Sequence, residues 1–250
     1  MSTYGDRGNV ICLQRRCEWR GMEVKITKLD QTVGVEAFEG IDLIVGGGAQ
    51  DRQQAIVMRD LQGAKSAQLI KMLRSGVPGV FTCGSPQLLG KYYEPGWEQR
   101  IEGLGFLDMV SKHPGPHSQR CIGNVVFEIT AEPLASELTT LLGGKKPIVV
   151  GFENHGGRTY LDKTIPLGQV ITGYGNNGED GGEGAFAYAA IATYAHGPLL
   201  PKNPFIADWM IIKALKNKYD LEVTLEPLLD PLVEEARLAM FKKLKLEHLA

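Results

Sequence analysis

The sequence predicts an α/β fold: a mostly parallel sheet with helices on both faces and antiparallel extensions. Two observations predict it. A compact apolar run at residues 41–45 leads through three glycines into a stretch with helical spacing at 51–74, and a second run at 80–82 leads through Cys83 into another helix. This strand–helix alternation is typical of parallel sheets, whose ligands bind beyond the carboxyl ends of the strands.

Length and charge limit the domain organisation and the partners. The chain has 250 residues, enough for one sizeable core. We expect the main domain at 1–200, with the helices of 201–250 packed on it or on a partner. With 27 basic and 29 acidic residues the net charge is −2, so no excess of Lys and Arg favours nucleic acid or an anionic membrane.

The cysteines and the hydropathy pattern indicate a cytoplasmic protein. The four cysteines show neither C-x-x-C spacing nor the density of a disulfide scaffold. Residues 1–10 do not resemble a signal peptide, and no apolar run reaches the roughly 18 residues needed to cross a membrane.

Further elements follow from periodicity and turn residues. Helical spacing follows the loop-like opening, residues 1–9, and strict alternation then predicts a half-buried or edge strand at 22–29. Residues 94–123 are interpreted as loops with short pieces, and the glycine-rich segment 173–184 either is a mobile surface loop or borders the site. Strands are also predicted at 125–129, 147–153, 169–172 and 190–194, and helices at 204–219 and 231–248.

Cys83 is the candidate nucleophile. It lies between a strand and a helix, where a side chain points into the crevice beyond the strand end, and Gly84 lets the backbone approach a substrate. The positive end of the following helix is expected to lower the thiol pKa. An inert buried cysteine at the end of a core strand explains this stretch alone equally well.

His196 is the candidate base, because it follows a buried strand and precedes Gly-Pro. An imidazole that accepts the thiol proton completes the minimum for thiolate catalysis. His113 and His117 are four residues apart in a Pro/Gly loop, so we expect no metal site there. For His155 and His248 we expect no catalytic role.

The glycines at 46–48 do not form a nucleotide site. Neither they nor residues 141–147 match the G-x-G-x-x-G or G-x-x-x-x-G-K-[ST] patterns, so we expect no ATP site in this chain. The same glycines can instead present a backbone N–H to an oxyanion, together with the N–H of Gly84.

Residues 79–90 resemble the nucleophile elbow of class I glutamine amidotransferases of the cobyric-acid-synthase-like branch, in which Cys-Gly-x-x-Gln-Leu-Leu-Gly follows a strand. Across nearly the whole chain, the joint order of motifs is similar to the GatD subunits of lipid II isoglutaminyl synthases. These motifs are YGDRGN at 4–9, CEWRG at 17–21, VGGGAQD at 45–51, IGN at 122–124, GFENH at 151–155, GYGNNG at 173–178 and YAHGP at 194–198. The resemblance implies a flavodoxin-like class I amidotransferase fold.

The resemblance also implies the chemistry. Cys83 would attack the side-chain amide of L-glutamine, form a thioester and release ammonia, with His196 as the base. Gly48 and Gly84 match the oxyanion donors, and Arg120 matches an arginine that holds the substrate α-carboxylate through a bidentate contact. A solvated loop cation is the alternative for Arg120.

The implied partner is a MurT-like ligase in a heterodimer. That subunit would bind ATP and lipid II and use the ammonia to amidate D-glutamate in peptidoglycan synthesis, so no cofactor is expected in this chain. The alternatives are an amidotransferase subunit of another synthetase, as in cobalamin biosynthesis, a stand-alone cysteine hydrolase, and a non-catalytic regulatory module.

The chain departs from the class I pattern at one point. Most members have His-x-Glu, whereas this sequence has His196-Gly197-Pro198, so the third catalytic member is missing from its usual place. Asp6 is a possible replacement that would orient the imidazole. Local turn or cap hydrogen bonding is the equally good alternative for Asp6.

Overall fold

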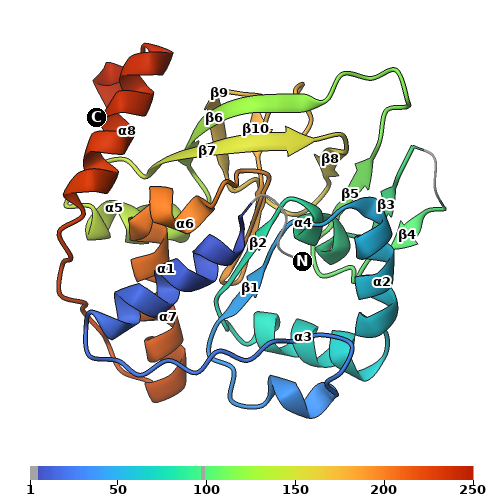
Figure 1. Ribbon diagram of the computed structural model, residues 1–250, viewed down its shortest axis with the longest axis horizontal. Helices are drawn as coiled ribbons and strands as arrows, with labels where there is room; N and C mark the ends of the chain where they lie inside the picture. The colour runs from blue at the N-terminus through green and yellow to red at the C-terminus, as the bar shows by residue number, and fades with distance from the viewer. Residues whose placement is uncertain (1–4, 97–98, 250) are drawn as a thin grey trace.

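The computed structural model describes residues 5–96 and 99–249 (Figure 1). The predicted loop at residues 1–4 lies outside this part of the chain. The described residues form helices and three four-stranded sheets, which confirms the α/β class. The sheets are mixed, with both parallel and antiparallel strands, rather than mostly parallel as predicted.

The central sheet has the strand order β1-β2-β12-β11. Its strand β2 pairs in parallel with β1 on one side and with β12 on the other, whereas β11 is antiparallel to β12. The parallel arrangement predicted from the two strand–helix units is therefore present here. The strands are β1 (Ile44–Gly46), β2 (Gly79–Thr82), β11 (Ala185–Ala187) and β12 (Ala190–Thr193).

The other two sheets are mainly antiparallel. The order β10-β9-β6-β7 contains antiparallel pairs only, and in the order β4-β3-β5-β8 the β3–β5 pair alone is parallel. The strands are β3 (Tyr92–Glu94), β4 (Ile101–Glu102), β5 (Met109–Lys112), β6 (Cys121–Ile129), β7 (Ile148–His155), β8 (Arg158–Leu161), β9 (Gly168–Thr172) and β10 (Gly182–Glu183).

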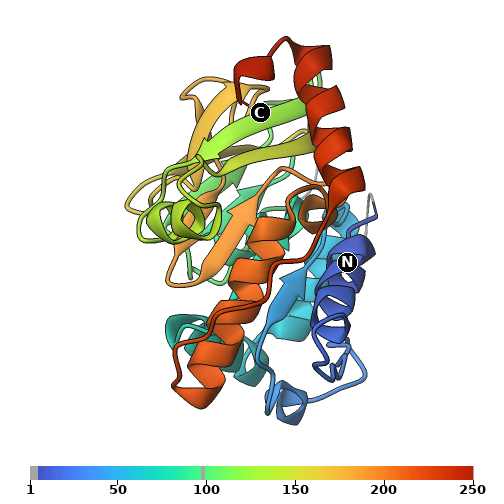
Figure 2. The same cartoon turned by 90° about the vertical axis from the view of Figure 1, so that its left-hand side faces the viewer.

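Helices cover both faces of the central sheet. Successive side chains of a strand point to opposite faces, and neighbouring side chains of β2 pack against different helices. Val80 packs in a core with residues of α1, α6 and α7, and Phe81 packs in another with residues of α3 and η1. Figure 2 shows the chain returning along α7 toward α8. The helices are α1 (Arg7–Glu18), η1 (Val35–Phe38), α2 (Asp51–Leu61), α3 (Ala64–Arg74), α4 (Gly84–Leu89), α5 (Leu134–Leu141), α6 (Leu199–Lys202), α7 (Pro204–Tyr219), α8 (Pro231–Leu244) and η2 (Glu247–Leu249).

Three predictions of secondary structure were wrong in part. Residues 22–29 form no strand, since this mostly exposed segment pairs with no neighbouring strand among the described residues. The helix predicted at 51–74 is two helices, because Gly63 adopts φ +77° between them. The segment predicted as loops with short pieces at 94–123 does contain the short strands β4 and β5, but the strand predicted at 125–129 begins earlier, at Cys121 of β6.

A buried ion cluster joins the N-terminal helix to the C-terminal part of the chain. The Arg16 guanidinium on α1 donates two hydrogen bonds of 2.7 Å to Asp208 on α7. It also donates to Asp230, the residue before α8, at 2.8 Å. Beyond this ion cluster, Phe241 of α8 packs against β6 and β7.

In the part of the chain that the structure describes, no helix is both long and apolar enough to cross a bilayer.

Candidate active site

The ends of three neighbouring strands bring the predicted site residues to one edge of the central sheet. Gly46 of β1 is in register with Phe81 of β2, and Thr82 of β2 is in register with Thr193 of β12. The next residues along these strands are the Gly47-Gly48 pair, Cys83 and the segment 194–196. The Cys83 N–H donates a 2.9 Å hydrogen bond to the Thr193 carbonyl, which ties the turn after β2 to the end of β12.

Cys83 has a backbone conformation typical of a nucleophile elbow. Its φ of 57° and ψ of −104° lie in a region that non-glycine residues rarely adopt, and α4 begins at the next residue. Residues held in such strained conformations cluster at active sites. Cys83 is 8% exposed and lines an open cavity, so it is not sealed in the core as the alternative interpretation required.

Gly48 and Gly84 allow two loops to approach the cysteine. A Cβ at Gly48 would lie 3.2 Å from the Cβ of Cys83 and 3.6 Å from its sulfur. A Cβ at Gly84 would lie 2.8 Å from Gln54 Nε2 and 2.9 Å from the Ala49 carbonyl oxygen. Both glycines therefore lie at close contacts, Gly48 against Cys83 and Gly84 against Ala49 and Gln54.

The Cys83 thiol is protonated at neutral pH in this structure, contrary to the sequence expectation. Its pKa is raised to about 12, mainly by burial and also by the charge of Asp6, and the Gly84 N–H and the charge of Arg120 offset only part of this rise. Desolvation thus outweighs the start of a short helix. The thiol needs a base to become a nucleophile.

His196 is buried and is fixed by the backbone of β7. The backbone N–H of His196 donates to the Phe152 carbonyl at 3.0 Å, and the backbone N–H of Phe152 donates to the His196 carbonyl at 3.1 Å. The His196 pKa is lowered to about 4, mainly by burial, with smaller contributions from the nearby His155 and Lys202. The imidazole is therefore neutral at pH 7, which is the form that accepts a proton.

Asp6 contacts the backbone of Gly48, a predicted oxyanion donor. Its Oδ2 accepts a 2.6 Å hydrogen bond from the Gly48 N–H, and the side chain is 2% exposed. Burial raises the Asp6 pKa, against the effect of the Gly48 and Thr82 hydrogen bonds. The side chain makes no cap hydrogen bond to α1, so the local capping alternative is wrong.

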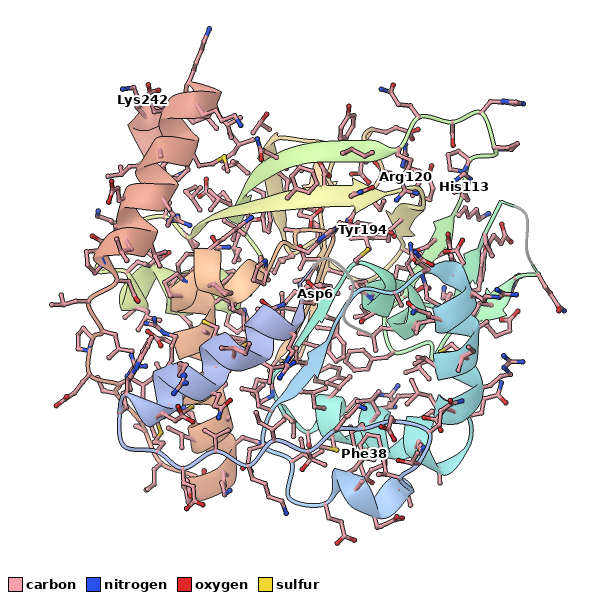
Figure 3. All side chains as sticks on the ribbon, viewed as in Figure 1. Asp6, Phe38, His113, Arg120, Tyr194 and Lys242 are labelled. Carbon is pink, nitrogen blue, oxygen red and sulfur yellow. The ribbon has the colours of Figure 1, made fainter. Side chains whose placement is uncertain are left out.

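Arg120 lies with Cys83 in a cavity of about 480 Å³, within the size range of small-molecule sites. Its Nε and Nη2 donate to Asn154 Oδ1 at 3.1 and 3.0 Å, and Nη2 also donates to the Asn154 carbonyl at 3.2 Å. Figure 3 shows Arg120 near His113, and both side chains approach Gly156. Arg120 thus lines the cavity and is anchored by Asn154, while its side chain stays exposed to solvent.

Sequence reasoning missed a buried polar network behind the cysteine. Tyr194 accepts a 3.0 Å hydrogen bond from Gln87 Nε2, shares one of 2.8 Å with the Thr159 hydroxyl, and stacks on His155 at 3.7 Å between ring centroids. His155 also lines the cavity of Cys83. Gln87 belongs to the elbow motif, which was a usable signal, whereas the stacking joins residues 39 positions apart and leaves no local pattern.

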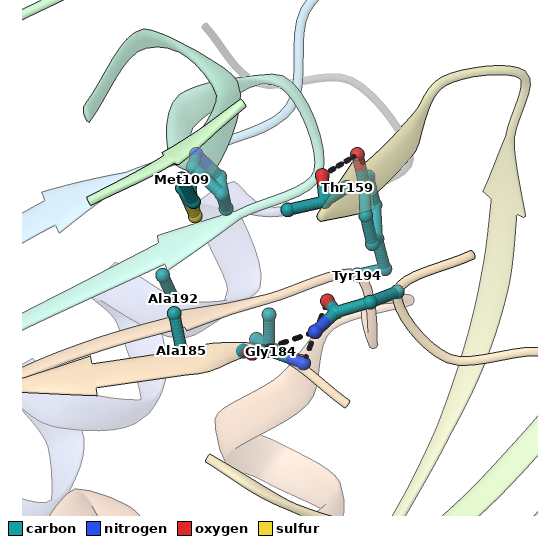
Figure 4. Close-up of a pocket in the computed structure, with 9 residues that line it drawn as sticks. Met109, Thr159, Gly184, Ala185, Ala192 and Tyr194 are labelled. Atoms are coloured by element: carbon teal, nitrogen blue, oxygen red, sulfur yellow. Dashed lines mark hydrogen bonds between the residues drawn. The ribbon is translucent and has the colours of Figure 1, made fainter. Parts of the chain in front are cut away.

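A second, much smaller cavity lies behind Tyr194 (Figure 4). Met109, Thr159, Gly184, Ala185 and Ala192 are among its lining residues, and its volume of about 10 Å³ admits one water molecule at most. It is too small for an amino acid.

Among the described residues no cluster of three or more His, Cys, Asp or Glu side chains has metal-binding geometry, and His113 and His117 belong to no such cluster.

The fold and the site thus define an α/β protein with a cysteine on a strand–helix turn, a glycine packed against it, and a buried imidazole after the end of a neighbouring strand. Residues 1–204 match the sequence model of the family described as "CobB/CobQ-like glutamine amidotransferase domain". The chain belongs to this family of glutamine amidotransferases.

Two members of known name have sequences similar to most of this chain. The lipid II isoglutaminyl synthase (glutamine-hydrolyzing) subunit GatD of Staphylococcus aureus is 37% identical over 218 residues, 87% of this chain and 82% of that protein. The subunit of the same name from Streptococcus pneumoniae is 34% identical over 238 residues, 94% of this chain and 84% of that protein.

Two solved structures support the fold alone. A glutamine amidotransferase aligns with a TM-score of 0.53 at 15% identity, covering 82% of this chain and 93% of its own. PurLQS from Thermotoga maritima aligns with a TM-score of 0.53 at 14% identity, covering 83% of this chain and 92% of its own.

Proposed function

We propose that this chain is the glutamine-hydrolysing subunit of a lipid II isoglutaminyl synthase and releases ammonia from L-glutamine. The observation that carries the proposal is the elbow conformation of Cys83 in a cavity that also contains Arg120. The identity to the two GatD subunits supports the choice of this synthase.

In the proposed reaction, the Cys83 sulfur attacks the carbonyl carbon of the glutamine side-chain amide while His196 accepts the thiol proton. The N–H groups of Gly48 and Gly84 stabilise the oxyanion of the tetrahedral intermediate. The C–N bond then breaks, and His196 returns the proton to the departing ammonia. Water, deprotonated by the same imidazole, hydrolyses the thioester to glutamate and frees the thiol.

The Asp6 contact adds a requirement to this mechanism. The Gly48 N–H already donates to Asp6 Oδ2, so it stabilises the substrate oxyanion only once that hydrogen bond is released or shared. We therefore assign Asp6 to the oxyanion side of the site. This assignment replaces the role of orienting His196.

The wider proposal concerns the partner and the organisation of the chain. A MurT-like ligase would form a heterodimer with it in the cytoplasm, bind ATP and the lipid II headgroup, and receive the ammonia, so this chain needs no cofactor of its own. Residues 1–200 would form a flavodoxin-like amidotransferase domain, supported by the parallel β1-β2-β12 core. Residues 201–250 would form the C-terminal helices.

The test uses L-glutamine labelled with ¹⁵N in the side-chain amide. The full chain is co-purified with its ligase partner from the native host and supplied with ATP and lipid II. We expect ¹⁵N in the α-carboxamide of D-isoglutamine. Labelled ammonia without amidated lipid II would point to another synthetase, and the absence of ammonia release would overturn the glutaminase assignment.

A further inference from the structure

The Cys83 cavity is lined by charged side chains of both signs that form no ion pair with one another: Asp51, Arg52 and Arg120. Asp51, the first residue of α2, lies on its wall, as does Arg120, which precedes β6. Within residues 5–96 and 99–249, no ion pair joins Asp51 to Arg120, and neither is paired with any other charged side chain there. The cavity therefore presents one anion, Asp51, and two cations, Arg52 and Arg120, to a ligand.

A hydrogen bond from a buried tyrosine fixes the Asp51 carboxylate. The Tyr93 hydroxyl donates a 3.1 Å hydrogen bond to its Oδ1, and Tyr93 itself is 3% exposed. Burial and the Asp51 charge raise the Tyr93 pKa, so the phenol keeps the proton that it donates. No side-chain hydrogen bond to Asp51 Oδ2 occurs in the described part of the chain, so this oxygen is available to a donor from the ligand.

The charges of Asp51 and Arg120 act on the same groups of the cavity wall that they share. Asp51 raises and Arg120 lowers the pKa of both Cys83 and His113, two further groups of the cavity wall. The nucleophile thus lies within reach of both fields. A ligand whose reactive end contacts Cys83 would have its other end between an anion and a cation.

We propose that Asp51 receives the α-ammonium group of L-glutamine while Arg120 receives its α-carboxylate. The inference rests on the proposed glutaminase function and deepens it, because it specifies what the site reads besides the amide. An L-α-amino acid carries both charges on one carbon, and a charge-assisted hydrogen bond to each is stronger than a neutral one. Asp51 then distinguishes glutamine from amides that lack the amino group.

A purely structural role is the competing explanation for Asp51. A carboxylate in the first turn stabilises a helix through the helix dipole, and Asp51 occupies that position in α2. That role predicts that loss of the charge affects all ligands equally. The ammonium site predicts that the loss depends on whether the ligand has an amino group.

The experiment measures binding of two ligands to the full chain in the Cys83→Ala background, which prevents turnover. One ligand is L-glutamine, and the other is 4-carbamoylbutanoate, which has the same amide and carboxylate but no amino group. The test variant adds Asp51→Asn. The matched control adds Asp60→Asn, on the same helix but paired with Lys65. Calorimetry gives each dissociation constant.

We expect Asp51→Asn to weaken L-glutamine binding about 10- to 100-fold and to leave 4-carbamoylbutanoate binding unchanged. The Asp60→Asn control should change neither constant. Equal weakening of both ligands, or no weakening of either, would overturn the assignment of Asp51. Failure of L-glutamine to bind the Cys83→Ala parent, and failure of the unmodified chain to release ammonia, would instead overturn the proposed function.

Discussion

Asp6 and Gly48 are joined by a buried hydrogen bond of 2.6 Å from the Gly48 N–H to Asp6 Oδ2, directly beside Cys83. The contact places a carboxylate at a backbone donor that the proposed reaction needs for the substrate oxyanion. It also places a negative charge next to a thiol that must lose its proton. The first effect competes with the oxyanion, and the second opposes thiolate formation.

The first prediction follows from this contact. Asp6→Asn removes a charge that raises the Cys83 pKa, so the thiolate fraction at a given pH should rise, by up to about tenfold. Alkylation of Cys83 by iodoacetamide, followed by peptide mass spectrometry between pH 7 and 9, measures this change. Asp162→Asn, at an exposed aspartate, is the control. An unchanged alkylation rate in Asp6→Asn would show that this charge does not act on the thiol.

The second prediction concerns pH. Because the pKa of His196 is lowered to about 4, the imidazole stays neutral through weakly acidic solution, and the acid limb of kcat/KM should lie well below pH 6.5. Between pH 7 and 5.5 we expect kcat/KM to fall by less than about twofold, compared with about tenfold for an unperturbed histidine. Lys202→Met removes a positive charge that lowers this pKa, so it should move the acid limb toward neutral pH. A limb near pH 6.5 in the unmodified chain would contradict the prediction.

The third prediction separates binding from chemistry. Arg120→Gln should raise KM for L-glutamine about 10- to 100-fold with little change in kcat, because the contact to the α-carboxylate is made equally in the ground and transition states. With 4-aminobutanamide, which lacks the carboxylate, the variant should resemble the unmodified chain. Arg158→Gln is the matched control, since Arg158 donates to the Gly156 and Gln119 carbonyls without lining the cavity. A fall in kcat alone would exclude a carboxylate-binding role for Arg120.

The fourth prediction tests the fold. Arg16→Met removes a cation that pairs with the carboxylates of Asp208 and Asp230. The two negative charges then lose this partner, so the free energy of unfolding should fall by about 3–5 kcal/mol. Arg15→Met, on the exposed side of the same helix, should cost under about 1 kcal/mol. Urea denaturation followed by circular dichroism measures both. Equal effects of the two substitutions would mean that the cluster does not hold α1 to α7.

The central strands and the elbow could be predicted from the sequence because their signals are local. The strand ending at Thr82 is short, apolar and followed by Cys83-Gly84, and each of these features has its own backbone meaning. The helix predicted at 204–219 coincides with α7, since its apolar stripe and its starting proline are also local.

The other features depend on distant neighbours. The alternation at 22–29 resembles a strand, but no neighbouring strand lies beside it in the described part of the chain. Two-residue strands such as β4 leave no period to detect. In the site, the contact of Asp6 with Gly48 and the stacking of His155 on Tyr194 exist only once the sheets have formed. The thiol pKa could not be predicted either, because burial determines it.

The most direct test of the central claim is the release of ammonia from L-glutamine by the full chain, together with its ligase partner, before and after Cys83→Ala. The account predicts that the substitution abolishes ammonia release, that the unmodified enzyme forms a glutamyl thioester on Cys83 that mass spectrometry detects after acid quench, and that both proteins have the same circular dichroism spectrum. Ammonia release that persists in a folded Cys83→Ala protein would contradict it.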